Sequence, residues 1–410
     1  EQKVQGFSNG KAINFNVFEE SQCEREVQKA DIVISMLPAR FHFNVAKACV
    51  KFGKNMVTAS YISPEIKELD QAAKDKNILI LNEIGLDPGL DHLSAKEIID
   101  DLQAKGAEIT AFKSFTGGLV APESDNNPWH YKFTWNPRNV VLAGQSTAKF
   151  IHNQRYKYVP YQRLFSYLHP LSFDDLGEFE GYPNRDSLSY RETYNLQNIP
   201  AMLRGTIRKK GYSRMWDTFV QLGITDDSFK LTNIKTFTYR DFVNAFLKYS
   251  VTDSVEEKLA DLMGFDIDGE EMQALKWLGI LDNTKIPMSE GTPAQILQSI
   301  LEKKWTLEED DKDMIIMQHH FKYKLAGQAK HLISSMVVYG EDTEHTAMSK
   351  TVGYPLAIAT KLILTDKIKI KGVHIPTKET IYKPILKELE GLNIKFTEKT
   401  KDISDEFLYE

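Results

Sequence analysis

An eleven-residue segment of this sequence, 82–92, carries the side chains best suited to chemistry. It reads NEIGLDPGLDH and directly follows the apolar run 78–81, while a helical pattern begins at about residue 90. Open α/β sheets place their ligands at such strand-to-helix turns, beyond the carboxyl ends of the strands. Asp87, held there by the next proline and glycine, could hold a cationic amine or accept a proton from it. Asp87 is therefore the first candidate for a catalytic residue.

The same segment has ionisable groups with simpler, structural explanations. Asp87 itself could be the N-cap of the following helix, because short acidic side chains accept hydrogen bonds from the first backbone N–H groups. Asp91 and His92 fall in the first helical turn, where an acidic side chain interacts favourably with the helix dipole.

Two histidines elsewhere in the chain also do not indicate a metal site. His319 and His320 alternate along a predicted strand, so their rings face opposite sides of it. We favour ligand contact for Asp87 and predict no metal site.

Two earlier strand-like runs end at the same predicted edge. The run 30–38 is continuous and apolar, as in a strand buried on both faces, and 54–60 gives the next strand. The residues at their ends, 35–38 and 57–61, would face the crevice that holds a dinucleotide in open α/β sheets. Tyr61 could donate a hydrogen bond to a carboxylate or help to transfer a proton, unless it only packs under a loop.

Strands and helices alternate around these candidates. Helices are predicted at 41–52 and from Ser63, a capping residue followed by proline at the first helical position. The alternation predicts an α/β fold with a Rossmann-type, doubly wound parallel sheet. Such a domain opens with a strand and a Gly-x-Gly-x-x-Gly turn, yet nothing before residue 30 contains one. We therefore expect the chain to start inside the domain, after its first βαβ unit.

The rest of the chain predicts a second α/β region with a helical insertion. A strand is expected at 107–119, amphipathic helices within 241–305, a hairpin across Gly327 and a long helix at 346–364. We expect three regions: a dinucleotide-binding domain of 1–92 with about 343–370, an α/β substrate domain of 93–225 with about 312–342 and 371–410, and a helical subdomain of 226–311.

Composition limits the classes of protein. The 410 residues carry a net charge of −6 and no block of Lys and Arg interleaved with aromatic residues, as a nucleic-acid surface would require. The sequence has no uncharged apolar run of membrane-spanning length and no signal peptide. Two cysteines, without a Cys-x-x-Cys spacing, indicate reduced thiols of a cytoplasmic protein. We expect a small-molecule substrate and no nucleic-acid or membrane partner, and a homodimer stays open.

Two longer segments carry a family resemblance. NEIGLDPGLDH at 82–92 and GGLVAPESDNNPWHYKFTW at 117–135 both resemble the saccharopine dehydrogenases of the glutamate-forming kind, also called saccharopine reductases. Shorter matches occur in the family's order: SMLPARFHFNVAKACV (35–50), VTASY (57–61), YPNRDS (182–187), LRGTIR (203–208) and TAMSKTVGYPLAIA (346–359). The resemblance covers nearly the whole chain. It implies NAD(P)-dependent hydride transfer that interconverts saccharopine with glutamate and 2-aminoadipate 6-semialdehyde.

The resemblance also implies roles for individual residues. Asp87 and Tyr61 would be catalytic and would handle the reacting amine and its proton. Substrate contacts would come from Ser60, Tyr61, Asp87, Arg185, Arg204, Gly205 and Thr206. Cofactor contacts would come from Met36, Leu37, Pro38, Val57, Thr58, Leu86, Asp87, Pro88 and Trp135. The family implies NADP, and NAD stays open because the segment that reads the ribose 2′ position lies outside the sequence.

Two arginines could bind the carboxylates of saccharopine. Saccharopine is a glutamate and a lysine joined through one secondary amine, and a planar guanidinium binds a carboxylate with a geometry that lysine cannot reproduce. Arg185 and Arg204 lie within family motifs, although each alone would more often form a surface ion pair. Trp135 could shield the hydride path from water, although a single Trp is more often part of a core. Thr116 stands where fungal members have Cys, so a thiol proton shuttle does not transfer here.

Two alternatives stay open. A related dehydrogenase that reduces an imine in polyamine metabolism, of the carboxyspermidine kind, would have a cleft lined by acidic groups in place of paired arginines. A non-catalytic ligand-binding relative would keep the fold without the phosphate-binding turn. The upstream sequence, with or without a Gly-rich turn, would separate the enzyme from this second alternative.

Overall fold

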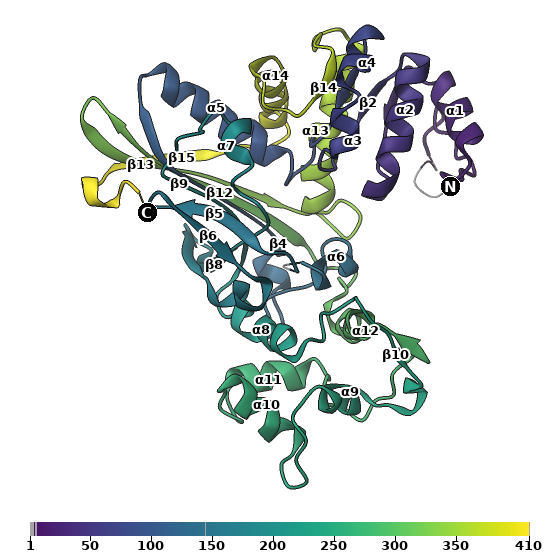
Figure 1. The fold of residues 1–410 in the computed structure, drawn as a ribbon, viewed down its shortest axis with the longest axis vertical. Coiled ribbons are helices and arrows are strands. Elements are labelled where there is room, and N and C mark those ends of the chain that lie inside the picture. The colour runs from purple at the N-terminus through teal and green to yellow at the C-terminus, as the bar shows by residue number, and fades with distance from the viewer. Residues whose placement is uncertain (1–3, 5, 144, 410) are drawn as a thin grey trace. The chain divides into compact units, whose positions relative to one another are not determined.

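The computed structural model describes residues 4, 6–143 and 145–409. The chain divides into two compact units. Unit 1 comprises Glu1–Glu97 and Val352–Leu392, and unit 2 comprises Ile98–Thr351 and Asn393–Glu410. Figure 1 shows the ribbon coloured from purple at the N-terminus to yellow at the C-terminus. Each unit therefore combines segments that are far apart in the sequence.

The described residues of unit 1 form a four-stranded sheet with parallel pairing throughout. Its strands are β1 (Ile32–Ile34), β2 (Asn55–Val57), β3 (Leu79–Leu81) and β14 (Gly372–His374), in the order β1-β2-β3-β14. Parallel neighbours require crossover connections, and helices between the strands supply them. The predicted α/β fold with a parallel sheet is confirmed. The structure differs from the predicted domain boundaries at 371–392, which lie in unit 1 because β14 pairs with β3.

The helices of unit 1 alternate with these strands. They are α1 (Glu20–Lys29), α2 (His42–Phe52), α3 (Pro64–Lys67), α4 (Asp70–Asp75), α14 (Glu379–Glu390), a 3-10 turn at Ala39–Phe41, and parts of α5 (Leu90–Ala104) and α13 (Ala347–Leu364). α3 begins as predicted, because Oγ of Ser63 accepts a hydrogen bond from the Ile66 N–H at 3.3 Å. Cys23 of α1 belongs to one buried core with Cys49 of α2 and Met56 of β2. This core holds the strands that end at the candidate site.

The described part of unit 2 forms a nine-stranded mixed sheet. Its strands are β4 (Glu108–Val120), β5 (Ala148–His152), β6 (Arg155–Val159), β7 (His169–Phe173), β8 (Gly177–Pro183), β9 (Ala201–Lys209), β12 (Asp313–Leu325), β13 (Gln328–Tyr339) and β15 (Thr397–Asp402). The order is β15-β13-β12-β4-β9-β5-β6, while β8 pairs with β9 and β7 with β8. The expected hairpin across Gly327 is confirmed, since β12 and β13 pair antiparallel along their whole length.

Unit 2 also contains helices and short turns between its strands. They are α6 (Pro137–Val141), α7 (Tyr190–Thr193), α8 (Tyr212–Leu222), α9 (Tyr239–Ala245), α10 (Val255–Met263), α11 (Glu270–Trp277) and α12 (Pro293–Trp305), with 3-10 turns at Pro122–Ser124, Tyr161–Ser166, Ile234–Thr236 and Asp405–Phe407 and a strand pair, β10 (Leu231–Thr232) and β11 (Glu290–Gly291). The amphipathic helices predicted within 241–305 are confirmed, and Figure 1 shows α9 to α12 gathered near α8. Trp129, Trp216 and Trp305 make ring contacts with Tyr212 of α8, so aromatic packing joins α8 to the end of α12 and to the loop that carries Trp129. None of the described helices has the length and apolar character that crossing a membrane requires.

Candidate functional site

The loops that follow β1, β2 and β3 are joined by backbone hydrogen bonds beyond the strands themselves. The Ser35 N–H donates to the Val57 carbonyl at 2.9 Å, and the Glu83 N–H donates to the Ser60 carbonyl at 3.1 Å. In open α/β proteins this edge, at the carboxyl ends of parallel strands, is where ligands bind. The side chains after the three strands therefore share one place in unit 1, which we call the strand-end site.

Tyr61 and Asp87, the two predicted catalytic residues, meet in this site. The Tyr61 hydroxyl donates a hydrogen bond to Oδ1 of Asp87 at 3.1 Å, and both residues are half-buried. A donated hydrogen bond stabilises the negative charge of a carboxylate, while partial exposure leaves it open to a ligand. At the start of α5 the Asp91 carboxylate accepts a hydrogen bond from the Gly89 N–H at 2.6 Å. An acidic group other than Asp87 thus binds a backbone N–H at the helix start.

The turn from β3 to α5 requires glycine at two positions. Gly89 has a φ of 150°, and a Cβ there would lie 2.0 Å from the Gly85 carbonyl oxygen. A Cβ on Gly85 would lie 2.9 Å from the Cβ of Ala59 on the neighbouring loop. Both distances are too short for a side chain, so only glycine allows the backbone to fold this closely. The compact turn fixes where Asp87 stands.

A buried pair, Glu83 and His92, supports the same turn. Oε2 of Glu83 lies 2.8 Å from Nε2 of His92, and Oε1 accepts a hydrogen bond from the Ile62 N–H at 3.0 Å. Both side chains are almost fully buried, where polar groups are stable only if they are hydrogen-bonded. Glu83 therefore connects helix α5 with the residue next to Tyr61. Both residues lie in the segment 82–92, but no local pattern there predicts this connection.

His42 links the other two loops and was not predicted as a site residue. Its Nδ1 lies 2.8 Å from Oγ of Ser35, and its Nε2 lies 2.7 Å from Oγ of Ser60. Burial lowers the pKa of His42 below its ordinary value, so the imidazole is neutral near pH 7. The one signal in the sequence is its position at the start of a helix that directly follows a strand end.

The predicted cofactor residues of unit 1 divide into accessible and buried positions. The accessible ones, at the end of β1, are Met36, Leu37 and Pro38. The buried ones are Val57, Thr58, Leu86 and Pro88. A ligand could meet the buried residues mainly through their backbone, whereas Met36 is 66% exposed and offers an apolar side chain. Exposed apolar surface beside polar strand ends is typical of a binding site.

In unit 2 the predicted substrate residues lie on two adjacent segments. Arg185 lies two residues after the end of β8, while Arg204, Gly205 and Thr206 lie on β9, which pairs with β8. The Arg204 guanidinium lies 4.0 Å from the centre of the Tyr190 ring, and the residue is only 6% exposed. Arg185 is exposed and has a positive φ of 46°. The two arginines thus occupy neighbouring parts of unit 2.

Two other positions of unit 2 bear on the predicted site. Trp135 is 40% exposed, so it is not a core residue. Thr116 on β4 stands opposite Thr206 on β9 in the strand pairing. Its Oγ1 is buried and, among the residues that the structure describes, has no hydrogen-bond partner. A buried hydroxyl in that state is suited to bind water or a ligand.

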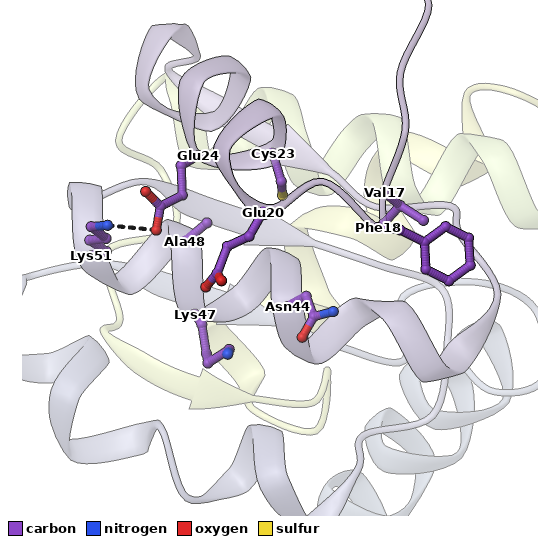
Figure 2. Close-up of a pocket in the computed structure, with 9 residues that line it drawn as sticks. All are labelled: Val17, Phe18, Glu20, Cys23, Glu24, Asn44, Lys47, Ala48 and Lys51. Atoms are coloured by element: carbon purple, nitrogen blue, oxygen red, sulfur yellow. Dashed lines mark hydrogen bonds and ion pairs between the residues drawn. The ribbon is translucent and has the colours of Figure 1, made fainter.

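Unit 1 also contains a pocket of about 420 Å³ beside α1 and α2 (Figure 2). Its lining residues are Val17, Phe18, Glu20, Cys23, Glu24, Asn44, Lys47, Ala48 and Lys51. Glu24 and Lys51 form an ion pair at 2.6 Å, drawn as a dashed line in Figure 2. The predicted site residues do not line this pocket. Across the described part of the chain, no group of three or more His, Cys, Asp or Glu side chains could hold a metal ion.

A parallel α/β unit that gathers hydroxyl, imidazole and carboxylate groups at its strand ends has the architecture of a dinucleotide-dependent enzyme. Comparison with protein families agrees with this class. Residues 3–81 match the saccharopine dehydrogenase NADP binding domain, and residues 85–394 match the saccharopine dehydrogenase C-terminal domain. The chain belongs to the saccharopine dehydrogenase family, and the resemblance seen in the sequence is confirmed.

Individual relatives agree in sequence and structure. The chain is 34% identical to saccharopine dehydrogenase (NADP(+), L-glutamate-forming) of Pyricularia oryzae, over 96% of this chain and 90% of that protein. It is 36% identical to mitochondrial alpha-aminoadipic semialdehyde synthase of Mus musculus, over 92% of this chain and 41% of that longer protein. The structure of apo histidine-tagged saccharopine dehydrogenase (L-Glu forming) from Saccharomyces cerevisiae matches with a TM-score of 0.87 and 33% identity, covering 98% of this chain and 91% of that one.

Proposed function

We propose that this protein is an NADP-dependent oxidoreductase acting on a CH–NH bond, which interconverts L-saccharopine with L-glutamate and 2-aminoadipate 6-semialdehyde in lysine metabolism. One observation carries the proposal. The Tyr61–Asp87 hydrogen bond lies at the strand ends of a parallel α/β unit, in a chain 34% identical over most of its length to an enzyme of that name.

NADP, when bound, supplies or accepts the hydride at the carbon next to the bridging nitrogen. Unit 1 fits a nicotinamide cofactor because its strand ends offer backbone groups and Met36 offers an exposed apolar side chain. The matching NADP binding domain favours NADP over NAD. We assign cofactor contacts to Met36, Leu37, Pro38, Val57, Thr58, Leu86, Asp87 and Pro88 of unit 1 and to Trp135 of unit 2.

Asp87 and Tyr61 would handle the proton of the bridging nitrogen. A secondary amine is protonated near pH 7 and must lose its proton before it can release a hydride from the neighbouring carbon. The Asp87 carboxylate would hold the ammonium group and take this proton. The Tyr61 hydroxyl would orient the carboxylate and stabilise its charge through the hydrogen bond that it donates. Thr116 is a poor proton carrier near neutral pH, so its hydroxyl would only bind.

The carboxylates of saccharopine would be held by a small set of residues. Arg204 is packed against Tyr190 and therefore presents its guanidinium in a limited range of directions. Arg185, on the adjacent segment, is exposed, and we assign it to a second carboxylate. We assign the remaining contacts to Ser60, Gly205 and Thr206. Guanidinium pairs of this kind favour a substrate with several carboxylates over a polyamine.

The test is oxidation of saccharopine by the purified protein with NADP⁺. The reaction is measured by the increase in NADPH absorbance and by the glutamate that is released. Carboxyspermidine serves as the competing substrate. We expect kcat/KM to favour saccharopine by roughly a hundredfold, because one lost charged hydrogen bond costs about 1.5–3 kcal/mol. A preference for carboxyspermidine would overturn the proposed substrate, and the absence of hydride transfer from either compound to NADP⁺ would support a non-catalytic relative.

We also propose a cytoplasmic location and a test for a homodimer. Both cysteines are free and buried, which suits a reducing compartment such as the cytoplasm. A homodimer is tested by light scattering of the purified protein, and a mass equal to one chain would exclude it.

A further inference from the structure

Three residues form a hydrogen-bonded series across two strand ends of unit 1. Ser35 follows β1, Ser60 follows β2, and His42 at the start of α2 lies between them, with contacts of 2.8 Å and 2.7 Å. The His42 residue is only 2% exposed. The Ser60 backbone is held separately, since its N–H donates to Oγ1 of Thr58 and its carbonyl accepts from Glu83. The direction of the Ser60 hydroxyl is therefore left to His42.

A neutral imidazole has one N–H and one bare nitrogen, so one serine must accept a hydrogen bond and the other must donate one. Which nitrogen carries the proton depends on what the other nitrogen bonds. Ser35 is almost fully buried, and the structure gives its hydroxyl His42 as a partner. If Nδ1 carried the proton, Ser35 would accept, and its own O–H would be a buried donor without an acceptor. Such a donor costs more free energy than an unused lone pair.

We infer that His42 is a positioning residue: Ser35 donates to its Nδ1, its Nε2–H donates to Ser60, and the Ser60 proton is thereby left to bind a carboxylate of the substrate. This inference rests on the proposed function, because Ser60 is assigned there as a substrate contact. Ser60 is half-buried, so its hydroxyl can contact His42 on one side and remain accessible to a substrate. The three hydrogen bonds run in one direction and reinforce one another. His42 would therefore affect substrate binding without contacting the substrate.

The kinetic test uses two substitutions that keep different halves of the imidazole. Asn is about as long as the Nδ1 side and keeps the Ser35 contact, whereas Gln reaches about as far as Nε2 and can still donate to Ser60. We expect His42→Asn to raise KM for saccharopine roughly three- to tenfold, with kcat and NADPH affinity changed less than about twofold. We expect His42→Gln to recover most of the loss. An equal loss in both variants would overturn the inference.

A double-mutant cycle tests whether the effect passes through Ser60. Because Ser60→Ala removes the group that His42 orients, adding His42→Asn to it should change KM by less than about twofold. A full additional loss in the double variant would show that His42 acts independently of Ser60 and would overturn the inference. Melting temperatures of all variants identify any that fail to fold.

Nitrogen NMR of the wild-type protein provides a readout that does not need activity. We expect the His42 ring to carry its proton on Nε2, and Ser35→Ala to populate both tautomers, because the donor that fixes Nδ1 is gone. A proton on Nδ1 in the wild type would overturn the inference even if the enzyme is active. If saccharopine is not a substrate, the proposed function fails, while the tautomer still decides the role of His42.

Discussion

At the scale of single residues, the strand-end site contains two polar pairs with different environments. The Tyr61–Asp87 pair is half-buried and open to a ligand, whereas the Glu83–His92 pair is sealed from solvent. A group can exchange a proton with substrate only if the two touch. Substitutions in the first pair should therefore damage turnover, and substitutions in the second should damage stability.

Asp87→Asn tests the first pair. An amide keeps the shape of the side chain but cannot take the proton of the bridging nitrogen, so we expect kcat to fall by ~10²–10⁴-fold. The free energy of unfolding in urea should change by less than about 1 kcal/mol, as for a partly exposed group. A normal kcat would reduce Asp87 to a structural residue of the turn.

Glu83→Ala tests the second pair. It leaves the buried His92 ring and the Ile62 N–H without their acceptor, and breaking a buried pair on one side costs about 3–5 kcal/mol. Urea denaturation should show this loss, and Glu65→Ala on the exposed face of α3 is the control. Equal stability of the two variants would contradict the supporting role of Glu83.

Arg185→Lys tests whether Arg185 binds a carboxylate of saccharopine. Lysine keeps the charge but not the planar, two-donor geometry, so binding of saccharopine should weaken by about 1.5–3 kcal/mol. NADPH affinity should stay the same, and Arg155→Lys on β6 is a matched control. If NADPH affinity falls equally, Arg185 belongs to a nucleotide phosphate instead.

At the scale of elements, the strands that could be predicted were those marked by a local sequence pattern. Continuous apolar runs gave β1 and β3, and alternation gave the β12–β13 hairpin. β14 has three residues and pairs with a strand far away in the chain, so no local pattern identifies it. The motifs at two strand ends identified Tyr61 and Asp87 as candidates, but their hydrogen bond was not predicted. The contacts of His42 and Glu83 were not predicted either, because they join residues 18 and 21 positions apart in the sequence and no motif marks them.

The sheet of unit 2 contains three half-buried histidines that should make stability depend on pH. Burial lowers the pKa of His169 on β7 and of His331 on β13 to about 4, and lowers that of His320 on β12 strongly. Nδ1 of His320 lies 3.1 Å from Nε2 of His331, so protonating both is unfavourable. Between the ordinary pKa, 6.5, and about 4, the unfolded chain binds protons that the folded chain does not. The free energy of unfolding should therefore fall as pH decreases through this window.

Urea unfolding of unit 2 at pH 7.5, 6.5 and 5.5 measures this dependence. His320→Gln cannot be protonated, so its stability should fall less steeply than that of the wild type. His345→Gln is the control, because His345 is exposed and Asp342 raises its pKa. The same slope in all three proteins would contradict the role of these half-buried histidines.

At the scale of the whole molecule, the division into two units predicts an unequal response to the cofactor. A ligand stabilises the part of a protein that binds it, by about 2.7 kcal/mol at a concentration of a hundred dissociation constants. We expect NADPH to raise the melting temperature of unit 1 more than that of unit 2. Hydrogen exchange of amides in β1–β3 and in β12–β13, with and without NADPH, measures the difference. Greater protection of β12–β13 would contradict the assignment of the cofactor to unit 1.

The parallel pairing of β14 with β3 also sets the order in which the newly made chain can fold. β3 leaves the ribosome about 290 residues before its neighbour, a delay of roughly 15–60 s at ~5–20 residues per second. During that time one edge of β3 has backbone groups without their final partner, and this edge is open to wrong pairing. Unit 2, whose longest hairpin is local, can form meanwhile. Unit 1 thus begins to emerge before unit 2 but lacks β14 until most of this chain has been made, and chaperones that shield strand edges would act on β3 throughout that time.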